Sequence, residues 1–293
     1  MKKNRLGTSD LYVNEISFGC MSLQKDNPEN ENLIREAVDN GVNFFDTADI
    51  YDFGWNEKVV GEALKPIRDD VIIATKVGHV QKGDGMGWEW RPTKKHILSN
   101  VEESLKRLQT DRIDLYQLHG GTLDDPIDDI IEAFELLKAQ GKIREYGISS
   151  IRPNVIRTYV KKGHIASVMM QYSLLDRRPE ESCLDLLHKS EISVLTRGSL
   201  AKGILVDKPA TEMLGYSNKE VEEMQKAVKE TGNPIGISLQ FVLNHPAVAS
   251  AVVGVRTGDQ LKEICQFFDD SVTEKELKKV ANLLEKNVYH NHR

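Results

Sequence analysis

Residues 43–51 read Asn-Phe-Phe-Asp-Thr-Ala-Asp-Ile-Tyr, an apolar run that ends in the carboxylate of Asp46 and is followed by the phenol of Tyr51. Such a run is typical of a buried strand that delivers polar groups to the edge of a sheet. Two later apolar runs end in the same way, one at Lys76 and one at His119. If these strands are parallel neighbours, their polar ends meet at one rim, where α/β folds place their chemistry.

The length and charge of the chain favour one domain that acts on a small molecule. At 293 residues, the chain fits a single barrel domain spanning 1–293, since such barrels routinely exceed about 200 residues. The net charge is -6, with both signs interspersed. This balance gives no basic field for nucleic acid and no polybasic patch for a membrane surface. It leaves the oligomeric state undetermined.

The cysteines and the start of the chain predict a cytoplasmic protein. Cys20, Cys183 and Cys265 are scattered without short-range pairing, which fits a reduced compartment better than a disulfide framework. The first ten residues lack the apolar core of a signal peptide. No run approaches the roughly 18 apolar residues of a membrane span.

A strand followed by a helix is the repeating unit of this sequence. A turn-rich cluster at 7–10 predicts an N-terminal β-hairpin, and a strand at 16–19 precedes a helix at 30–40. Further strands are expected at 43–48, 71–77, 113–119, 143–149, 167–172, 193–198 and 250–254, and helices at 56–64, 94–108, 127–140, 153–162, 180–189, 219–230 with 236–244, and 258–268. Eight such units predict an α/β fold, a (β/α)8 TIM barrel, with an extra C-terminal helix at 273–286 packed across it.

Seven short segments give the chain a resemblance to the aldo-keto reductase family. They lie at expected strand ends or in the loops that follow, in the family's order, between Gly19 and Glu263. The segments are Phe45-Asp46-Thr47-Ala48 with Tyr51, Thr75-Lys76, Leu115-Tyr116-Gln117-Leu118-His119, Gly147-Ile148-Ser149, Gln171-Tyr172-Ser173, Leu200-Ala201-Lys202-Gly203, and Gly254 with Gln260-Leu261-Lys262-Glu263. The resemblance implies a (β/α)8 barrel that binds a nicotinamide cofactor across its C-terminal rim without a Rossmann domain.

The four strand-end groups suit the reduction of a carbonyl, which needs a hydride at carbon and a proton at oxygen. Tyr51 is the expected general acid. A free phenol titrates near pH 10, so we expect Lys76 to lower its pKa by stabilising the phenolate. Asp46 would hold the ammonium of Lys76 as an ion pair, and His119 would orient the substrate oxygen.

Taken singly, each of these residues also has an ordinary structural interpretation, and two other functions stay open. Lys76 could act as a Schiff-base nucleophile in a lyase. The chain could also be a cofactor-sensing subunit similar to the cytosolic potassium-channel β subunits, although it shows no docking extension beyond the barrel. A metal site at His119 is disfavoured because no second His or Cys stands at ligand spacing near it.

The cofactor's nicotinamide end is predicted at the fifth and sixth barrel strands. Ser149 and Gln171 carry groups suited to a carboxamide, and Tyr172 offers a face for ring stacking. Members of the family often have Asn or Arg where this chain has Ser150, which is carried over as a cofactor residue.

The phosphate end is predicted at the seventh and eighth strands, and NADPH is the expected cofactor. Arg256 resembles the residue that reads the 2′-phosphate, just before a helix whose N-terminus favours anions. Ile264 stands where the family usually has Asn. The remaining cofactor residues implied by the resemblance are Met21 and Asp46, then Arg197, Ser199, Leu200, Lys202 and Gly203 near the pyrophosphate, and Gly254, Gln260 and Glu263 near the adenosine.

The segment at 78–91 is expected to be a long glycine-rich loop carrying Trp88 and Trp90. Gly83, Gly85 and Gly87 lie in its middle. It could form a lid or wall of the substrate pocket, or its tryptophans could pack onto the neighbouring helix. Trp55, close to Tyr51, is a further candidate for the pocket wall. The physiological carbonyl substrate is not specified by these residues.

Overall fold

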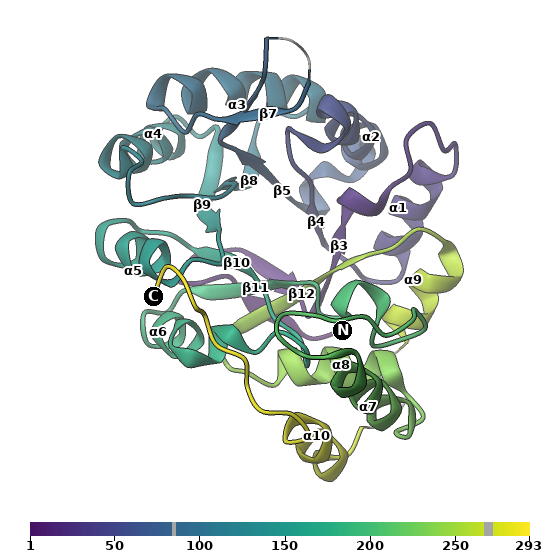
Figure 1. The fold of residues 1–293 in the computed structure, drawn as a ribbon. Helices are drawn as coiled ribbons and strands as arrows, with labels where there is room; N and C mark the ends of the chain where they lie inside the picture. The colour runs from purple at the N-terminus through teal and green to yellow at the C-terminus, as the bar shows by residue number, and fades with distance from the viewer. Residues whose placement is uncertain (84–85, 267–271) are drawn as a thin grey trace.

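Eight parallel strands close into a barrel in a computed structural model of the chain, which describes residues 1–83, 86–266 and 272–293 (Figure 1). Each strand pairs with its neighbours in chain order, and the last pairs with the first. The predicted (β/α)8 barrel is therefore confirmed. The strands are β3 (Ile16–Gly19), β4 (Phe44–Asp46), β5 (Ile72–Val77), β8 (Ile113–Leu118), β9 (Ile143–Ser149), β10 (Ser167–Gln171), β11 (Ser193–Arg197) and β12 (Val248–Gly254).

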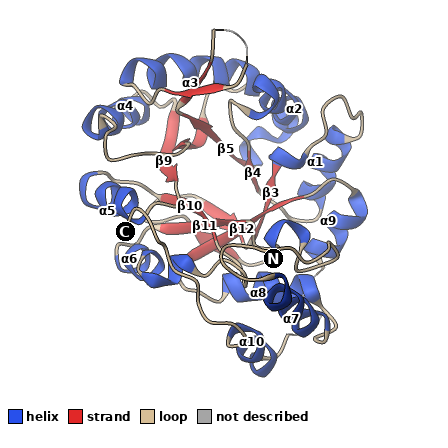
Figure 2. Ribbon diagram, in the orientation of Figure 1, coloured by secondary structure: helices blue, strands red, loops and turns tan. Residues whose placement is uncertain are grey.

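Helices surround the strands on the outside (Figure 2). The apolar stripes of these helices pack on the outer face of the barrel, so strands such as β5 and β8 are buried along their whole length. Within the described ranges, no helix has the length and apolar character needed to cross a bilayer. The helices are α1 (Asn30–Asp39), α2 (Trp55–Leu64), α3 (Lys94–Leu108), α4 (Ile127–Ala139), α5 (Pro153–Lys162), α6 (Cys183–Lys189), α7 (Asn218–Lys229), α8 (Pro234–Leu243), α9 (Gly258–Cys265) and α10 (Glu274–Ala281).

The predicted N-terminal hairpin forms from β1 (Lys3–Arg5) and β2 (Tyr12–Asn14) and closes one end of the barrel. Its turn buries Leu6 and Leu11 in a cluster with inward-facing strand residues. Gly7 lies so close to the barrel that a Cβ there would stand 2.6 Å from the carbonyl oxygen of Ala166. The hairpin therefore lies at the end of the barrel opposite the rim where the sequence predicts the active site.

The segment predicted as a loop at 78–91 is instead a small hairpin. Strands β6 (His79–Gln81) and β7 (Trp88–Trp90) pair antiparallel, with His79 opposite Trp90. The Trp90 indole donates a 2.8 Å hydrogen bond to Asp125 before α4, which fixes the hairpin to the barrel rim. Gly85 lies outside the described residues.

Three predicted helices differ at their ends. The helix predicted at 180–189 is divided into a 3-10 turn and α6, because Ser182 between them has a non-helical backbone with φ -160°. The terminal helix, predicted to reach 286, ends at Ala281 because Tyr216 donates its hydroxyl to the Glu285 carbonyl at 2.6 Å. It packs on α7 and α8 rather than across the barrel. The helix predicted to 268 ends at Cys265, and residues 267–268 are not described.

Candidate active site

An ion pair joins the ends of two neighbouring strands inside the barrel rim. Lys76 on β5 donates hydrogen bonds of 2.7 Å to Asp46 Oδ2 and 2.7 Å to the Thr47 carbonyl. Gln117 on β8 donates to the other Asp46 oxygen at 3.4 Å. The register pairs Lys76 with Gln117 and pairs Asp46 with Ala74, two residues before Lys76, so the three side chains meet at the same rim. The ammonium is thereby held in one position.

The turn after β4 brings Tyr51 onto this ion pair. Its hydroxyl lies 3.4 Å from Lys76 Nζ, whose charge also lies 5.1 Å from the centre of the ring. The next two residues, Asp52 (φ 46°) and Phe53 (φ 57°), adopt left-handed backbone conformations. Such strain costs about 1–3 kcal/mol per residue and is found mainly at functional sites. The surrounding structure holds this turn in a costly shape that points the phenol at Lys76.

His119, directly after β8, completes the group. Its ring meets the ring of Tyr51 edge-on, with 6.0 Å between centroids. Its Nδ1 is buried and has no hydrogen-bond partner within the described part of the chain. The structure thus brings Asp46, Tyr51, Lys76 and His119 together, as the sequence predicted.

Burial and the neighbouring charges together set the protonation of these groups. Burial favours a neutral Lys76, but Asp46 and Tyr51 outweigh it and raise the pKa of the amine. For Tyr51, burial raises the pKa more than Lys76 lowers it, contrary to the expected net decrease. Burial, aided by the charge of Lys76, lowers the pKa of His119 to about 2. At neutral pH the site therefore holds an ammonium, a protonated phenol and a neutral imidazole.

A cavity of about 480 Å³ opens beside His119 at the ends of β8, β9 and β11. Three predicted cofactor residues, Ser149, Ser150 and Arg197, line it. Sequence reasoning missed His79, Thr122 and Arg152, which line it as well. Each stands shortly after the end of a barrel strand, and that position was the signal that could have identified them.

At β10 the structure differs from the expected stacking arrangement. Gln171 is half-buried at the strand end, but Tyr172 is only 3% exposed. Its ring packs 5.2 Å from that of Phe241, and its hydroxyl donates to Glu180 at 3.0 Å. The ring face predicted for stacking is therefore largely covered by neighbouring side chains.

The loop after β11 turns sharply through left-handed residues. Gly198, Ala201 and Lys202 all have positive φ. Such turns can aim successive backbone N–H groups at an anion. Ser199 is buried and shares a 3.0 Å hydrogen bond with Thr196, whereas Lys202 is exposed. Leu200 and Gly203 in the same loop are half-buried.

The end of β12 leads directly into α9. Thr257 caps this helix by accepting from the Gln260 backbone at 3.3 Å, and the Gln260 side chain accepts from the Arg256 backbone at 3.0 Å. The Arg256 side chain is exposed. Ser22 ties the adjacent turn to this strand end by donating to the Val255 carbonyl at 2.8 Å. The other predicted residues here are Met21, Gly254 and Glu263, all exposed.

The three tryptophans occupy different places around the site. Trp90 lines the cavity, with its ring edge-on to His79 at 4.9 Å. Trp88 stacks on Phe53 at 5.3 Å and so joins the β6–β7 hairpin to the Tyr51 turn. Trp55 is half-buried at the start of α2. Trp90 matches its predicted place in the pocket wall most directly.

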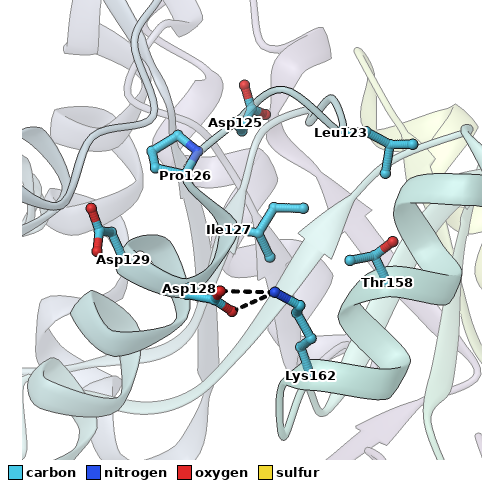
Figure 3. A pocket seen from close by; sticks show the side chains of 8 residues that line it. All are labelled: Leu123, Asp125, Pro126, Ile127, Asp128, Asp129, Thr158 and Lys162. Carbon is cyan, nitrogen blue, oxygen red and sulfur yellow. Dashed lines mark hydrogen bonds and ion pairs between the residues drawn. The ribbon is translucent and has the colours of Figure 1, made fainter.

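Another cavity, of about 420 Å³, lies on the outside of the barrel between α4 and α5 (Figure 3). Lys162 crosses it and donates to both carboxylate oxygens of Asp128, at 2.7 and 2.8 Å. The ammonium of Lys162 is paired with this carboxylate, and the residues that line the cavity include no histidine or tyrosine. The cavity therefore does not repeat the combination of acid and base groups found at the barrel rim. Among the described residues, no group of three or more His, Cys, Asp or Glu side chains is placed to hold a metal ion.

Comparison with known proteins gives one family. The family model described as "Aldo/keto reductase family" matches residues 15–285. The chain is 47% identical to an uncharacterized oxidoreductase, YqkF, of Bacillus subtilis, over 100% of both chains. The holo form of the aldo-keto reductase AKR11C1 from Bacillus halodurans superposes with a TM-score of 0.96, at 46% identity over 100% of this chain and 99% of that one. Its apo form gives a TM-score of 0.88, at 45% identity and the same coverage. This protein therefore belongs to the aldo-keto reductase family and is an NAD(P)H-dependent oxidoreductase.

Proposed function

We propose that this protein reduces aldehydes or ketones to alcohols with NADPH, and that Tyr51 is the general acid. The observation that carries the proposal is the position of the Tyr51 hydroxyl, 3.4 Å from Lys76 Nζ, on a ring that lies edge-on to His119, which lines the cavity. A bound nicotinamide cofactor supplies the hydride. The chain's own residues must then bind the carbonyl, protonate its oxygen and keep the new charge stable.

Tyr51 is protonated at neutral pH and can donate its proton; burial raises the pKa of its phenol, and the charge of Lys76 offsets part of that increase. When the proton moves to the carbonyl oxygen, a phenolate forms next to the ammonium of Lys76, which stabilises it. Asp46 holds that ammonium in place. His119 is neutral and can donate a hydrogen bond that orients the carbonyl oxygen.

The ion pair and hydrogen bonds of Lys76 disfavour a Schiff-base lyase. Such an enzyme needs a neutral amine as its nucleophile. Lys76 is ion-paired, buried and has a raised pKa, so its amine stays protonated. The ammonium serves as a fixed charge.

The residues at the rim fit a nicotinamide cofactor. The cavity wall carries the hydroxyls of Ser149 and Ser150 and the guanidinium of Arg197, which are donors suited to a carboxamide and to phosphate. The closer match to the holo than to the apo form of AKR11C1 supports the same assignment. In the proposed site Gln171 also holds the carboxamide, the pyrophosphate lies near Ser199, Leu200, Lys202 and Gly203, and the adenosine lies near Met21, Gly254, Gln260 and Glu263.

A preference for NADPH over NADH is proposed from Arg256. Its exposed guanidinium stands immediately before the N-cap of α9, where a 2′-phosphate would meet both the cation and the helix N-terminus. NADH lacks that phosphate and would lose both interactions.

Two measurements test the proposed function in sequence. A titration of intrinsic fluorescence with NADPH first establishes binding. The cofactor-loaded protein is then mixed with a panel of aldehydes and ketones that includes activated nitrobenzaldehydes, while NADPH absorbance is followed. Oxidation of NADPH that depends on the carbonyl supports a reductase. Tight binding without oxidation across the panel would instead favour a cofactor-sensing subunit.

A further inference from the structure

A second histidine, His79, lies in the substrate cavity next to His119. The two rings are edge-on, with 5.7 Å between centroids, and both line the cavity. His79 is held firmly, because its strand pairs with β7 and its ring packs against Trp90. Gly78 makes this packing possible, since a Cβ there would stand 2.5 Å from the Trp90 ring.

The two imidazoles share one pattern of burial. Among the residues that the structure describes, Nδ1 of each ring is buried and has no hydrogen-bond partner. Neither Nε2 is among the buried unpaired atoms of those residues, and both rings line the cavity, so we place each Nε2 toward it. A neutral imidazole carries one N–H and one bare nitrogen. Because a buried N–H without an acceptor is rarer than an unpaired acceptor, the proton belongs on Nε2 in both rings.

Both rings are neutral near pH 7. Burial lowers the pKa of His79, and the neighbouring His96 adds to the decrease. The pKa of His119 is lowered further by the same cause. The cavity wall therefore presents two N–H donors side by side without adding positive charge.

We propose that His79 is a specificity-determining residue that binds a second substrate oxygen, on the carbon next to the reacting carbonyl, while His119 binds the carbonyl itself. The substrates favoured in this way are 1,2-dicarbonyls and 2-hydroxyaldehydes. The inference rests on the proposed function, because it assigns the carbonyl to His119. The ring centroids are 5.7 Å apart and each N–H···O bond spans about 2.9 Å, so the two neighbouring donors can reach oxygens on adjacent carbons of one substrate.

The reaction is unchanged by this contact. The hydride adds to the carbonyl carbon, and the proton from Tyr51 adds to its oxygen. The second oxygen keeps its bonds and serves only for recognition. With a substrate that lacks this oxygen, the His79 N–H bonds to water instead, so the decrease in kcat/KM is modest. One neutral hydrogen bond corresponds to roughly a three- to tenfold change in kcat/KM.

The test compares methylglyoxal with propanal, which has the same carbon skeleton but lacks the second oxygen. The quantity measured is the ratio of their kcat/KM values, in wild type, His79→Leu and His79→Gln. Taking the ratio relative to wild type cancels the greater intrinsic reactivity of methylglyoxal. We expect His79→Leu to lower the ratio roughly three- to tenfold, mainly through the KM of methylglyoxal, and His79→Gln to restore part of it with its amide N–H.

Controls separate recognition from folding and from the reaction itself. His188→Leu, at an exposed histidine on α6, should leave the ratio unchanged. The affinity for NADPH should be equal in all four proteins. If His79→Leu lowers both kcat/KM values equally, the inference is overturned while the proposed function stands. If cofactor-loaded wild type reduces 4-nitrobenzaldehyde but neither of these compounds, the inference is overturned while the proposed function stands; if it reduces none of the three, both fail.

A spectroscopic measurement addresses the tautomer directly and does not depend on turnover. In long-range ¹H–¹⁵N correlation spectra of wild type, His79 should show protonation at Nε2 and no titration between about pH 6 and 8. A signal from protonated Nδ1 would overturn the inference.

Discussion

Lys76 and Asp46 form an ion pair of 2.7 Å in the interior of the barrel rim, where their side chains are 1% and 6% exposed. The pair fixes the cation that stabilises the proposed Tyr51 phenolate. It also makes each charge depend on the other, because an unpaired charge at this depth is strongly unfavourable. The same contact therefore contributes to the proposed chemistry and to stability.

Replacing one member of the Lys76–Asp46 pair should lower the free energy of unfolding more than replacing both. Lys76→Met is expected to lower the free energy of unfolding by about 3–5 kcal/mol, because it leaves Asp46 buried and unpaired. The double variant Lys76→Met with Asp46→Leu should recover much of that loss, while neither variant reduces a carbonyl. Urea denaturation measures the stabilities. A single variant as stable as wild type would show that the pair is not the buried unit seen here.

The cofactor preference should depend on Arg256. A charge-assisted hydrogen bond contributes about 1.5–3 kcal/mol, so NADPH should bind roughly ten- to a hundredfold more tightly than NADH. Arg256→Ala should remove most of this difference, and high salt should reduce it in wild type.

Lys262→Ala provides the control for Arg256, since Lys262 is an exposed cation on the same helix. It should leave the ratio of the two dissociation constants near that of wild type. Equal affinities in wild type, or a preference that survives Arg256→Ala, would show that the phosphate is read elsewhere.

Asp49 should make the stability of the protein depend on pH. One of its oxygens accepts from Asn100 at 2.9 Å, and the other is buried with no hydrogen-bond partner in residues 1–83, 86–266 and 272–293. Burial, followed by the charge of Glu57, raises its pKa to about 7, against about 3.9 in an unfolded chain. The folded state therefore favours the protonated acid. Its contribution is complete below about pH 4 and is lost as the pH rises through about 7.

Asp49→Asn isolates this contribution. The amide cannot ionise, so the variant should be more stable than wild type at pH 8, by on the order of 2–4 kcal/mol, and should lack the decline between about pH 4 and 7. Chemical denaturation at several pH values measures both curves. Parallel curves for the two proteins would assign the titration to another group.

Gly61 marks a close approach of two helices. A Cβ on this residue of α2 would stand 2.5 Å from the backbone of Leu108 at the end of α3. Gly61→Ala should therefore destabilise the protein by about 1–3 kcal/mol, although alanine favours a helix. Gly83→Ala, where a Cβ meets nothing within 4 Å, is the control. Equal thermal unfolding temperatures for the two variants would contradict the close approach.

The sequence predicts the barrel and the central four residues well because both follow from local patterns. Buried parallel strands read as apolar runs, and their ends meet at one rim by topology, so Asp46, Lys76 and His119 could be brought together without coordinates. Tyr51 joins them because only a short turn separates it from β4.

The errors lie where distant parts of the chain decide the local structure. The β6–β7 hairpin is fixed by the hydrogen bond from Trp90 to Asp125, 35 residues further along the chain. The glycines of this segment led to the prediction of a loop. The end of α10 depends on Tyr216, far upstream. The pKa of Tyr51 was predicted in the wrong direction because the depth of burial, which outweighs Lys76, is a property of the packed barrel.

The most direct test of the proposed reaction is a single turnover with the cofactor already bound. Wild type and Tyr51→Phe are loaded with NADPH and mixed with 4-nitrobenzaldehyde, and the rate of NADPH oxidation is recorded. If Tyr51 supplies the proton, wild type oxidises its NADPH, whereas Tyr51→Phe does so at least about a hundredfold more slowly with an unchanged Kd for NADPH. Oxidation at comparable rates in the two proteins would contradict the assignment of Tyr51 as the acid.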